Sequence, residues 1–387
     1  MQNAEELPPG LHASATQCGI RRRSLDLGLI VADEPRPAAA IYTRSLLQGA
    51  HIEVCREHLA ETRGRIRALL VNSGNANCST GRQGVDDNRR ICAALAELVG
   101  CAPKEVLFLS TGVIGERLPV ERILDSLPAL TSADAIQGTQ AFAQAIMTTD
   151  MVPKVVSDRL SDGARAVGIG KGSGMIHPNM ATMFGFLLTD ASIGDAPVDL
   201  LRRVNSRSFQ RMTVDGDTSP NDTVVLWGGN KTGLPPTDLE PTLDGLAQGL
   251  ARRMASDGEG ATRLVTVRVE GAPDIESAVR VGRTIATSPL VKTAVHGRDP
   301  NWGRIVAAAG RAEVEFDMHA ARCWIGDALL FSQGIPHPEN ENEAHMHMLQ
   351  DKEILLRVDL ARGNASADIW TCDFSSDYVR INADYRS

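Results

Sequence analysis

Aromatic residues are scarce in this chain of 387 residues, where Phe, Trp and Tyr together make up only 4%. Hydrophobic residues nevertheless reach 43%, so Ala, Val, Leu and Ile must fill the interior of a globular protein. Nowhere do 18 apolar residues run together, which argues against a membrane-spanning helix. The N-terminus lacks a basic region followed by an apolar core, so we expect no secretory signal peptide.

Cysteines are present, but their spacing indicates neither a disulfide framework nor a metal site. The seven cysteines are odd in number, scattered, and include no Cys-X-X-Cys pair, which argues against a disulfide scaffold or a zinc ribbon and favours reduced thiols. Long runs of Lys or Arg are also missing and the net charge is −8, so we expect neither nucleic acid nor an anionic membrane as a partner. The composition predicts a soluble cytoplasmic protein.

Apolar runs rich in β-branched residues alternate with amphipathic helical patterns along the chain. The runs predict strands over 27–32, 38–43, 66–71, 106–109, 154–160, 164–169, 183–188, 223–227, 264–269, 353–358, 367–371 and 378–381. Helical spacing predicts helices over 85–99, 120–127, 135–147, 198–209, 243–254, 275–285 and 302–309. Asp162-Gly163 lies between two predicted strands and indicates a hairpin, because this pair tolerates positive φ. We therefore expect an α/β protein with mixed sheets.

The most informative segment is Lys171-Gly-Ser-Gly-Met-Ile-His-Pro-Asn-Met-Ala-Thr182. A Thr preceded by Ala can attack its own upstream carbonyl if the turn is strained. Cleavage of the Ala181–Thr182 bond would leave Thr182 with a free α-amine, and such amines have a pKa of about 7.7–8.0. That amine can act as a base for the adjacent hydroxyl, so one residue would supply both nucleophile and base. The ordinary alternative is a strand residue after a glycine turn.

The glycines between residues 168 and 174 do not fit a nucleotide-binding loop. Counted from Gly168, the sixth position of the dinucleotide fingerprint is Ser173 rather than Gly. Lys171 is followed by Gly172, where a Walker loop needs Ser or Thr. A glycine-rich turn that lets the backbone approach a substrate, or that bends sharply enough to self-cleave, fits better.

Several polar segments allow both a functional and an ordinary structural explanation. Thr111 and Gly112 follow a predicted strand, and their hydroxyl and unhindered N–H favour either an oxyanion hole or a plain exit from the strand. The segment 148–150 either contacts a substrate or ends a helix. The segments 72–77 and 296–304 are typical of Asx-type loops, which need no function.

Two acidic segments also leave alternatives open. After a predicted helix, either Gly258 is the C-cap or the carboxylate of Glu259 holds a cationic group of a substrate. In the polar, exposed loop expected over 337–347, His345 and His347 lie near three glutamates. Their i, i+2 spacing is more typical of a solvated loop than of a metal site, so no metal is expected.

Taken together, these segments resemble the ornithine acetyltransferase family, the self-cleaving enzymes of the cyclic arginine pathway. The matching segments are 72–77, 110–115, 145–150, 171–183, 213–219, 256–262, 288–294, 296–304 and 378–387. They occur in the family's order. One such string is weak evidence, but nine in order are very specific.

The resemblance implies a role for each matching residue. Thr182 corresponds to the nucleophile exposed by cleavage after Ala181, which divides the chain into an α chain, 1–181, and a β chain, 182–387, intertwined in one protomer. Thr111 and Gly112 correspond to the oxyanion hole. The substrate-binding positions implied by the resemblance are Thr149, Lys171, Thr182, Glu259, Asn382 and Ser387.

The family fold is a four-layer αββα sandwich with mixed sheets, of the N-terminal-nucleophile type, and the cleaved protomer generally forms an α₂β₂ or larger assembly. The activity implied is acetyl transfer from N2-acetyl-L-ornithine to L-glutamate through an acetyl-threonine, without a metal or redox cofactor. Whether acetyl-CoA also serves as a donor stays open. So do three alternatives: a hydrolase on a similar self-cleaving scaffold, a paralogue of specialised metabolism, and a non-catalytic metabolite-binding protein.

Overall fold

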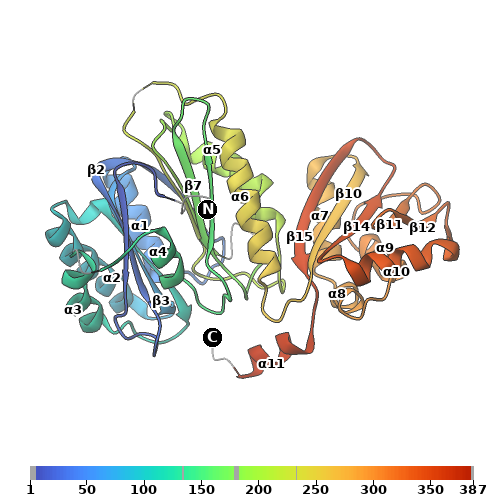
Figure 1. The fold of residues 1–387 in the computed structure, drawn as a ribbon, viewed down its shortest axis with the longest axis horizontal. Coiled ribbons are helices and arrows are strands. Elements are labelled where there is room, and N and C mark those ends of the chain that lie inside the picture. The colour runs from blue at the N-terminus through green and yellow to red at the C-terminus, as the bar shows by residue number, and fades with distance from the viewer. Residues whose placement is uncertain (1–5, 133–134, 178–182, 232, 385–387) are drawn as a thin grey trace.

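The computed structural model describes residues 6–132, 135–177, 183–231 and 233–384, which form two adjoining lobes (Figure 1). The larger lobe contains a nine-stranded sheet in the order β4-β3-β2-β9-β8-β7-β6, with β1 paired to β2 and β5 paired to β1. Its strands are β1 (Leu11–Thr16), β2 (Leu27–Tyr42), β3 (Arg65–Asn75), β4 (Val106–Val113), β5 (Ile136–Gln137), β6 (Lys154–Arg159), β7 (Arg165–Lys171), β8 (Phe184–Thr189) and β9 (Thr223–Trp227).

Strand β2 belongs to two halves of this sheet. Its first part pairs with β1 and β3, and its last five residues pair with β9. The register shifts between Val31 and Arg36, next to Pro35 and Pro37. The sequence predicted two strands here, whereas the structure has one, because a residue that precedes proline favours an extended backbone.

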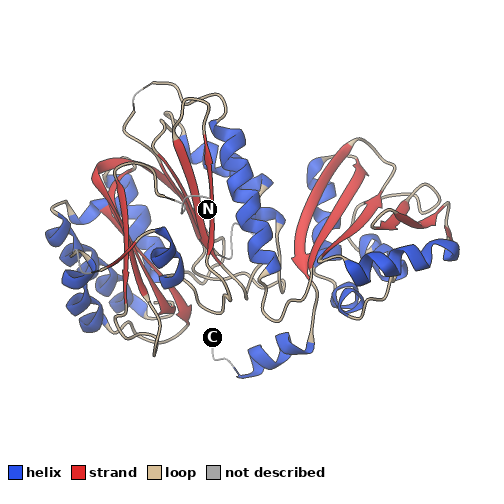
Figure 2. Ribbon diagram, viewed as in Figure 1, coloured by secondary structure: helices blue, strands red, loops and turns tan. Residues whose placement is uncertain are grey.

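The two halves pack face to face, with helices outside, and give four layers (Figure 2). Apolar residues of both halves, among them Leu69 and Phe186, share one core. Helices α2 and α3 pack on the outer face of the first half, and α5 and α6 on the outer face of the second. The bounds are α1 (Ala50–Glu61), α2 (Gly81–Val99), α3 (Val120–Leu130), α4 (Thr139–Ala145), α5 (Pro197–Arg207) and α6 (Leu239–Ser256). The predicted αββα sandwich is confirmed for this lobe.

Successive side chains of a strand point to opposite faces of the sheet, so each strand contributes to two cores. Along β3, Leu69 and Val71 point into the core between the sheet halves, whereas Ala68 and Leu70 pack under the helices. Strands buried on both faces need continuous apolar sequence, which is the signal that predicted them. The sheet is mixed as expected, since β3–β4 and β8–β9 are parallel and β6–β7 is an antiparallel hairpin.

The smaller lobe holds a second mixed sheet in the order β13-β12-β11-β14-β10-β15. Its strands are β10 (Leu264–Ala272), β11 (Arg322–Ile325), β12 (Ala328–Ser332), β13 (Ile335–Pro336), β14 (Glu353–Asp359) and β15 (Ala365–Cys372). The helices that follow the larger lobe are α7 (Ile275–Ala286), α8 (Pro289–His296), α9 (Trp302–Gly310), α10 (Glu341–Gln350) and α11 (Ser376–Asp384). Short 3₁₀ turns lie at Pro103–Glu105, Phe209–Arg211 and Pro338–Asn340. Helix α11 leaves the end of β15 and runs back below the larger lobe (Figure 1).

Three further local predictions are wrong, and the helix predicted over 135–147 begins only at Thr139, after the short strand β5. The segment 378–381 lies in α11 rather than in a strand, because Ser375 Oγ accepts hydrogen bonds from the first amides of that helix. The loop expected over 337–347 is largely helix α10. Gly168 and Gly170 lie within β7 rather than in a turn. A Cβ at Gly170 would lie 2.2 Å from a methyl group of α6, so this glycine permits close packing of the helix.

None of the helices in the described ranges is long and apolar enough to cross a lipid bilayer. The seven cysteines all fall within those ranges, and their thiols are free.

Candidate active site

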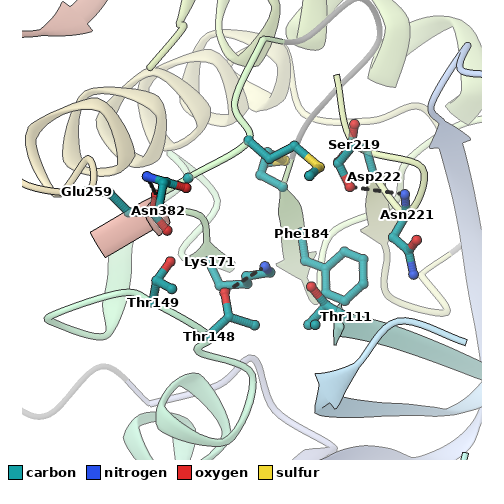
Figure 3. Close-up of a pocket in the computed structure, with 14 residues that line it drawn as sticks. Thr111, Thr148, Thr149, Lys171, Phe184, Ser219, Asn221, Asp222, Glu259 and Asn382 are labelled. Atoms are coloured by element: carbon teal, nitrogen blue, oxygen red, sulfur yellow. Dashed lines mark hydrogen bonds between the residues drawn. The ribbon is translucent and has the colours of Figure 1, made fainter. Parts of the chain in front are cut away.

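Residues from segments far apart in the sequence line one cavity of about 100 Å³ (Figure 3). The lining residues are Thr111, Gly112, Thr148, Thr149, Lys171, Gly174, Met175, Met183, Phe184, Ser219, Asn221, Asp222, Glu259 and Asn382. Every predicted site residue within the described ranges is among them. Ala181, Thr182 and Ser387 lie outside those ranges, so their roles stay predictions. Met183, the neighbour of Thr182 in the chain, lines the cavity.

Thr111 and Gly112 lie near the end of β4, which continues to Val113 and does not turn away after the apolar run. Gly112 pairs with Gly74 of β3 and has a φ of +134°. A Cβ at Gly112 would lie 2.3 Å from the carbonyl carbon of Gly74, so only glycine allows this approach of the two backbones. The pairing brings Thr111 to the wall of the cavity.

Lys171 is the last residue of β7, and its ammonium group lies beside Thr148 (Figure 3). Nζ donates to Thr148 Oγ1 at 3.2 Å and lies 5.8 Å from the ring centroid of Phe184. Burial lowers the pKa of Lys171, while neighbouring carboxylates, Asp150 first among them, oppose that shift. A desolvated cation in a cavity is suited to pair with an incoming carboxylate.

Glu259 and Asn382 meet at one side of the cavity (Figure 3). Asn382 Nδ2 donates to Glu259 Oε2 at 2.8 Å, which ties α11 to the segment after α6. A Cβ at Gly174 would lie 2.3 Å from the carboxyl carbon of Glu259, so a glycine is needed for the carboxylate to occupy this position. Gly258 is not a left-handed cap of α6, because the positive φ falls at Gly260.

A buried ion network next to the cavity was not predicted from the sequence. Lys154 Nζ donates to Asp150 Oδ1 and to Asp257 Oδ2, each at 2.6 Å, and the three side chains are at most 10% exposed. Burial by itself would raise the pKa of Asp150, but the nearby lysine charges hold that pKa below its ordinary value. Asp150 also accepts hydrogen bonds from Gly172 N at 2.7 Å and Thr148 N at 3.0 Å. The network therefore fixes the loop after α4 against the end of β7.

The segment that precedes the predicted cleavage site is held by the loop before β9. Asp215 accepts hydrogen bonds from Met175 N at 2.6 Å and Ile176 N at 2.8 Å. Thr218 Oγ1 donates to His177 O at 2.9 Å. Met175 has a φ of +53°, a left-handed conformation that is uncommon for a residue with a side chain. The chain thus enters the predicted cleavage segment from a constrained backbone.

Asn221 joins separate strands at the wall of the cavity. Its Nδ2 donates to Ala76 O at 2.5 Å and Ser110 O at 2.6 Å. Its main-chain carbonyl lies 3.1 Å from His51 Nε2, and because a carbonyl only accepts, Nε2 carries the proton. Burial lowers the pKa of His51 to about 3, so the imidazole is neutral in the folded protein.

We expect His51 to make the protein less stable as the pH falls from 6.5 toward 3. The unfolded chain takes up a proton at this side chain near pH 6.5, while the folded chain does so only near pH 3. Stability decreases as the pH is lowered wherever the unfolded state binds more protons than the folded state, and the gap between the two pKa values corresponds to about 4–5 kcal/mol. NMR of the imidazole should show no titration between pH 7 and 4, and a midpoint near 6.5 would contradict the assignment.

Two of the predicted polar segments also meet at a residue that does not line the cavity. The segments 256–262 and 296–304 converge on Asp373, just past β15. Its carboxylate accepts a hydrogen bond from Thr262 N at 2.7 Å and pairs with His296 Nδ1 at 2.7 Å. This junction holds the chain from which α11 reaches the cavity.

The histidines of α10 are engaged in local contacts. His345 Nδ1 lies 3.0 Å from Arg298 O, and His347 Nδ1 pairs with Asp351 Oδ2 at 2.7 Å. Across the described ranges, no group of three or more His, Cys, Asp or Glu side chains is placed to hold a metal ion.

Comparison with known proteins gives matches along nearly the whole chain. The model of the ArgJ family matches residues 12–387. The arginine biosynthesis bifunctional protein ArgJ of Parasynechococcus marenigrum is 45% identical, with 98% of this chain and 94% of that protein covered. The protein of the same name from Synechocystis sp. is 41% identical, with 98% of this chain and 96% of that protein covered.

A crystal structure of arginine biosynthesis bifunctional protein ArgJ from Bacillus halodurans is also similar. It is 37% identical, and the match covers 51% of this chain and 96% of that one with a TM-score of 0.48. The family model and the two curated relatives confirm the resemblance read from the nine sequence segments. The chain belongs to the ArgJ family.

Proposed function

We propose that the chain moves an acetyl group from N2-acetyl-L-ornithine to L-glutamate, giving ornithine and N-acetylglutamate. The observation that carries this proposal is the convergence of Thr111, Gly112, Lys171 and Glu259 on one cavity that Met183 also lines. A cation and a carboxylate in one cavity suit substrates that carry both a carboxylate and an ammonium group. The names of the curated relatives, which refer to arginine biosynthesis, support the choice of amino acids.

Thr182 is the proposed nucleophile, exposed when the chain cleaves itself after Ala181. Its α-amine accepts the hydroxyl proton while Oγ attacks the carbonyl carbon of the acetyl group. The hydroxyl of Thr111 and the N–H of Gly112 donate to the developing oxyanion, and one such donor typically contributes about 10²–10³ in rate. The ornithine nitrogen then leaves with the proton, and the acetyl group stays as an ester on the threonine.

The second half of the reaction transfers the acetyl group to the amine of glutamate, and the free hydroxyl is restored. Lys171 pairs with the substrate carboxylate, and Glu259, which Asn382 holds in place, pairs with an ammonium group. Thr149 and Ser387 complete the proposed substrate-binding set. An activated hydroxyl and positioned dipoles suffice for this chemistry, so it calls for no metal or redox cofactor.

Strands from both sides of the proposed cleavage site lie in one sheet. β8 pairs with β7 along the whole of β8, from Ala166 and Thr189 to Lys171 and Phe184. This pairing supports the proposal that the α chain, 1–181, and the β chain, 182–387, stay intertwined after cleavage. We propose an α₂β₂ or larger assembly of these chains. We also propose a cytoplasmic location, which the free thiols support.

The dependence of the reaction on glutamate tests the proposal against a hydrolase. Without glutamate, acetylornithine consumption should stop after about one turnover per active site, because the acetyl ester has no acceptor. Adding glutamate should restore continuous turnover. Continuous release of acetate at the same rate without glutamate would instead support the hydrolase. Acetyl-CoA in place of acetylornithine tests in the same assay whether it is a second donor.

A further inference from the structure

The loop 213–219 holds the chain just before the segment that contains the proposed cleavage site. Asp215 on this loop accepts hydrogen bonds from Met175 N through Oδ2, at 2.6 Å, and from Ile176 N through Oδ1, at 2.8 Å. Asp217 N donates to the same Oδ1 at 3.2 Å. Both carboxylate oxygens therefore fix main-chain amides, and two of these amides are consecutive in the chain.

The surroundings of Asp215 favour strong hydrogen bonds. Burial raises the pKa of Asp215, and the three amide donors oppose that shift because they favour the charged carboxylate. Hydrogen bonds to an ionised acceptor are shorter and about twice as strong as those between neutral groups, which agrees with the short contacts to Met175 and Ile176. Burial, followed by the charge of Asp215, raises the pKa of Tyr378 on α11, so the phenol of that helix lies near the same carboxylate.

The backbone held by Asp215 has an unfavourable conformation. Met175 has a φ of +53°, and a residue with a side chain keeps such a conformation only where its surroundings impose it. Asp215 binds the amide of Met175, and Val214 N donates to Ile176 O at 2.7 Å. Two neighbouring residues of one loop thus fix the amides and a carbonyl of this short stretch.

The chain is also held just after the segment that contains the proposed cleavage site. Met183 O accepts a hydrogen bond from Thr223 N at 3.1 Å, and Phe184 then pairs with Thr223 in the sheet. Because this end is fixed, the direction in which the chain arrives at the other end decides how the Ala181–Thr182 bond meets the attacking hydroxyl. A misplacement of about 1 Å can lower a rate by about 10²-fold.

We propose that Asp215 is a positioning residue for self-cleavage, which acts by fixing the main chain of Met175 and Ile176. In that reaction Oγ of Thr182 bonds to the carbonyl carbon of Ala181. The C–N bond then breaks, the hydroxyl proton passes to the new amine, and water hydrolyses the resulting ester. Asp215 supplies no proton and forms no bond in these steps.

This inference rests on the proposed self-cleavage, and it separates the requirements of cleavage from those of acetyl transfer. Once the chain is cut, the stretch that Asp215 holds is no longer joined to Thr182. Lys171 and Glu259, which are proposed to bind the substrate, are held by other contacts. Loss of Asp215 should therefore slow cleavage much more than acetyl transfer.

The rate of self-cleavage after synthesis tests the proposal. The full chain is made by cell-free translation, and denaturing mass analysis follows the uncut fraction with time. Asp215→Asn keeps the size of the side chain but leaves one acceptor oxygen, and it should slow cleavage about tenfold or more. Asp215→Ala should slow it further. The matched control is Asp217→Asn, because this exposed residue contacts Asp215 through its amide and not its carboxylate. The control should cleave at the unmodified rate.

Acetyl transfer by cut chains separates positioning from general damage to the site. After long incubation, turnover per cut chain should stay within about twofold of that of the unmodified protein. Circular dichroism checks folding, and Asp215→Asn alone decides the test if Asp215→Ala does not fold. Cleavage of Asp215→Asn at the rate of the control overturns the proposal. So does an equal loss of cleavage and of turnover per cut chain.

The unmodified protein distinguishes a failure of this inference from a failure of the proposed function. If it is cut but transfers no acetyl group, acetyl transfer is contradicted, and slower cleavage of Asp215→Asn than of the control still supports the positioning role. If it stays uncut, both proposals are overturned.

Discussion

Replacing Thr182 with Ala is expected to leave the chain uncut at 41.5 kDa and to reduce acetyl transfer by about 10⁴-fold or more. Alanine has no hydroxyl, so it can neither attack the upstream carbonyl nor accept the acetyl group. The mass of the protein under denaturing conditions shows whether the chain is cleaved, and the rate at which N-acetylglutamate forms measures the acetyl transfer.

The matched control is Thr182→Ser, which keeps a hydroxyl beside the new amine. It should still cleave and transfer, at a reduced rate. A Thr182→Ala protein that makes N-acetylglutamate at the normal rate would show that another group is the nucleophile.

Replacing Lys154 with Met is expected to lower the free energy of unfolding by about 3–5 kcal/mol, because it leaves buried carboxylates without their cation. Asp150 and Asp257 each lie 2.6 Å from Lys154 Nζ and are at most 10% exposed. Urea denaturation measures the change. Adding Asp257→Asn to the Met variant should restore part of the loss, since one unpaired charge is then removed.

A surface lysine provides the control for that substitution. Lys231 is exposed, and its Nζ lies 3.7 Å from Asp162 and 4.0 Å from Asp190. Lys231→Met should cost at most about 1 kcal/mol, because exposed ion pairs are screened by water and salt. Equal losses in the two Met variants would contradict the structural role given to Lys154.

Much of the larger lobe could be predicted because its strands are long and apolar. The strand predicted over 223–227 matches β9 residue for residue. The smaller lobe was not recognised as a separate unit, because β11 and β12 have only four and five residues. Strands this short give too little periodicity to be distinguished from loops.

Some residues of the site could likewise be predicted from the sequence, and others could not. The resemblance of short sequence segments to the family identified residues such as Lys171, Glu259 and Asn382. The structure places these residues at one cavity. The contact of Lys154 with Asp257 joins positions 103 residues apart, and although Asp257 lies in the matching segment 256–262, nothing in that segment indicates Lys154 as its partner. Such pairs depend on tertiary packing, so a single sequence does not reveal them.

The mass of the protein after brief incubation with acetylornithine alone tests most directly whether Thr182 carries the acetyl group. Two chains are expected under denaturing conditions, with the chain that begins at Thr182 heavier by one acetyl group. Subsequent addition of glutamate should remove that group. A single intact chain, or two chains of which neither gains an acetyl group, would contradict the central claim that a self-exposed threonine carries the acetyl group.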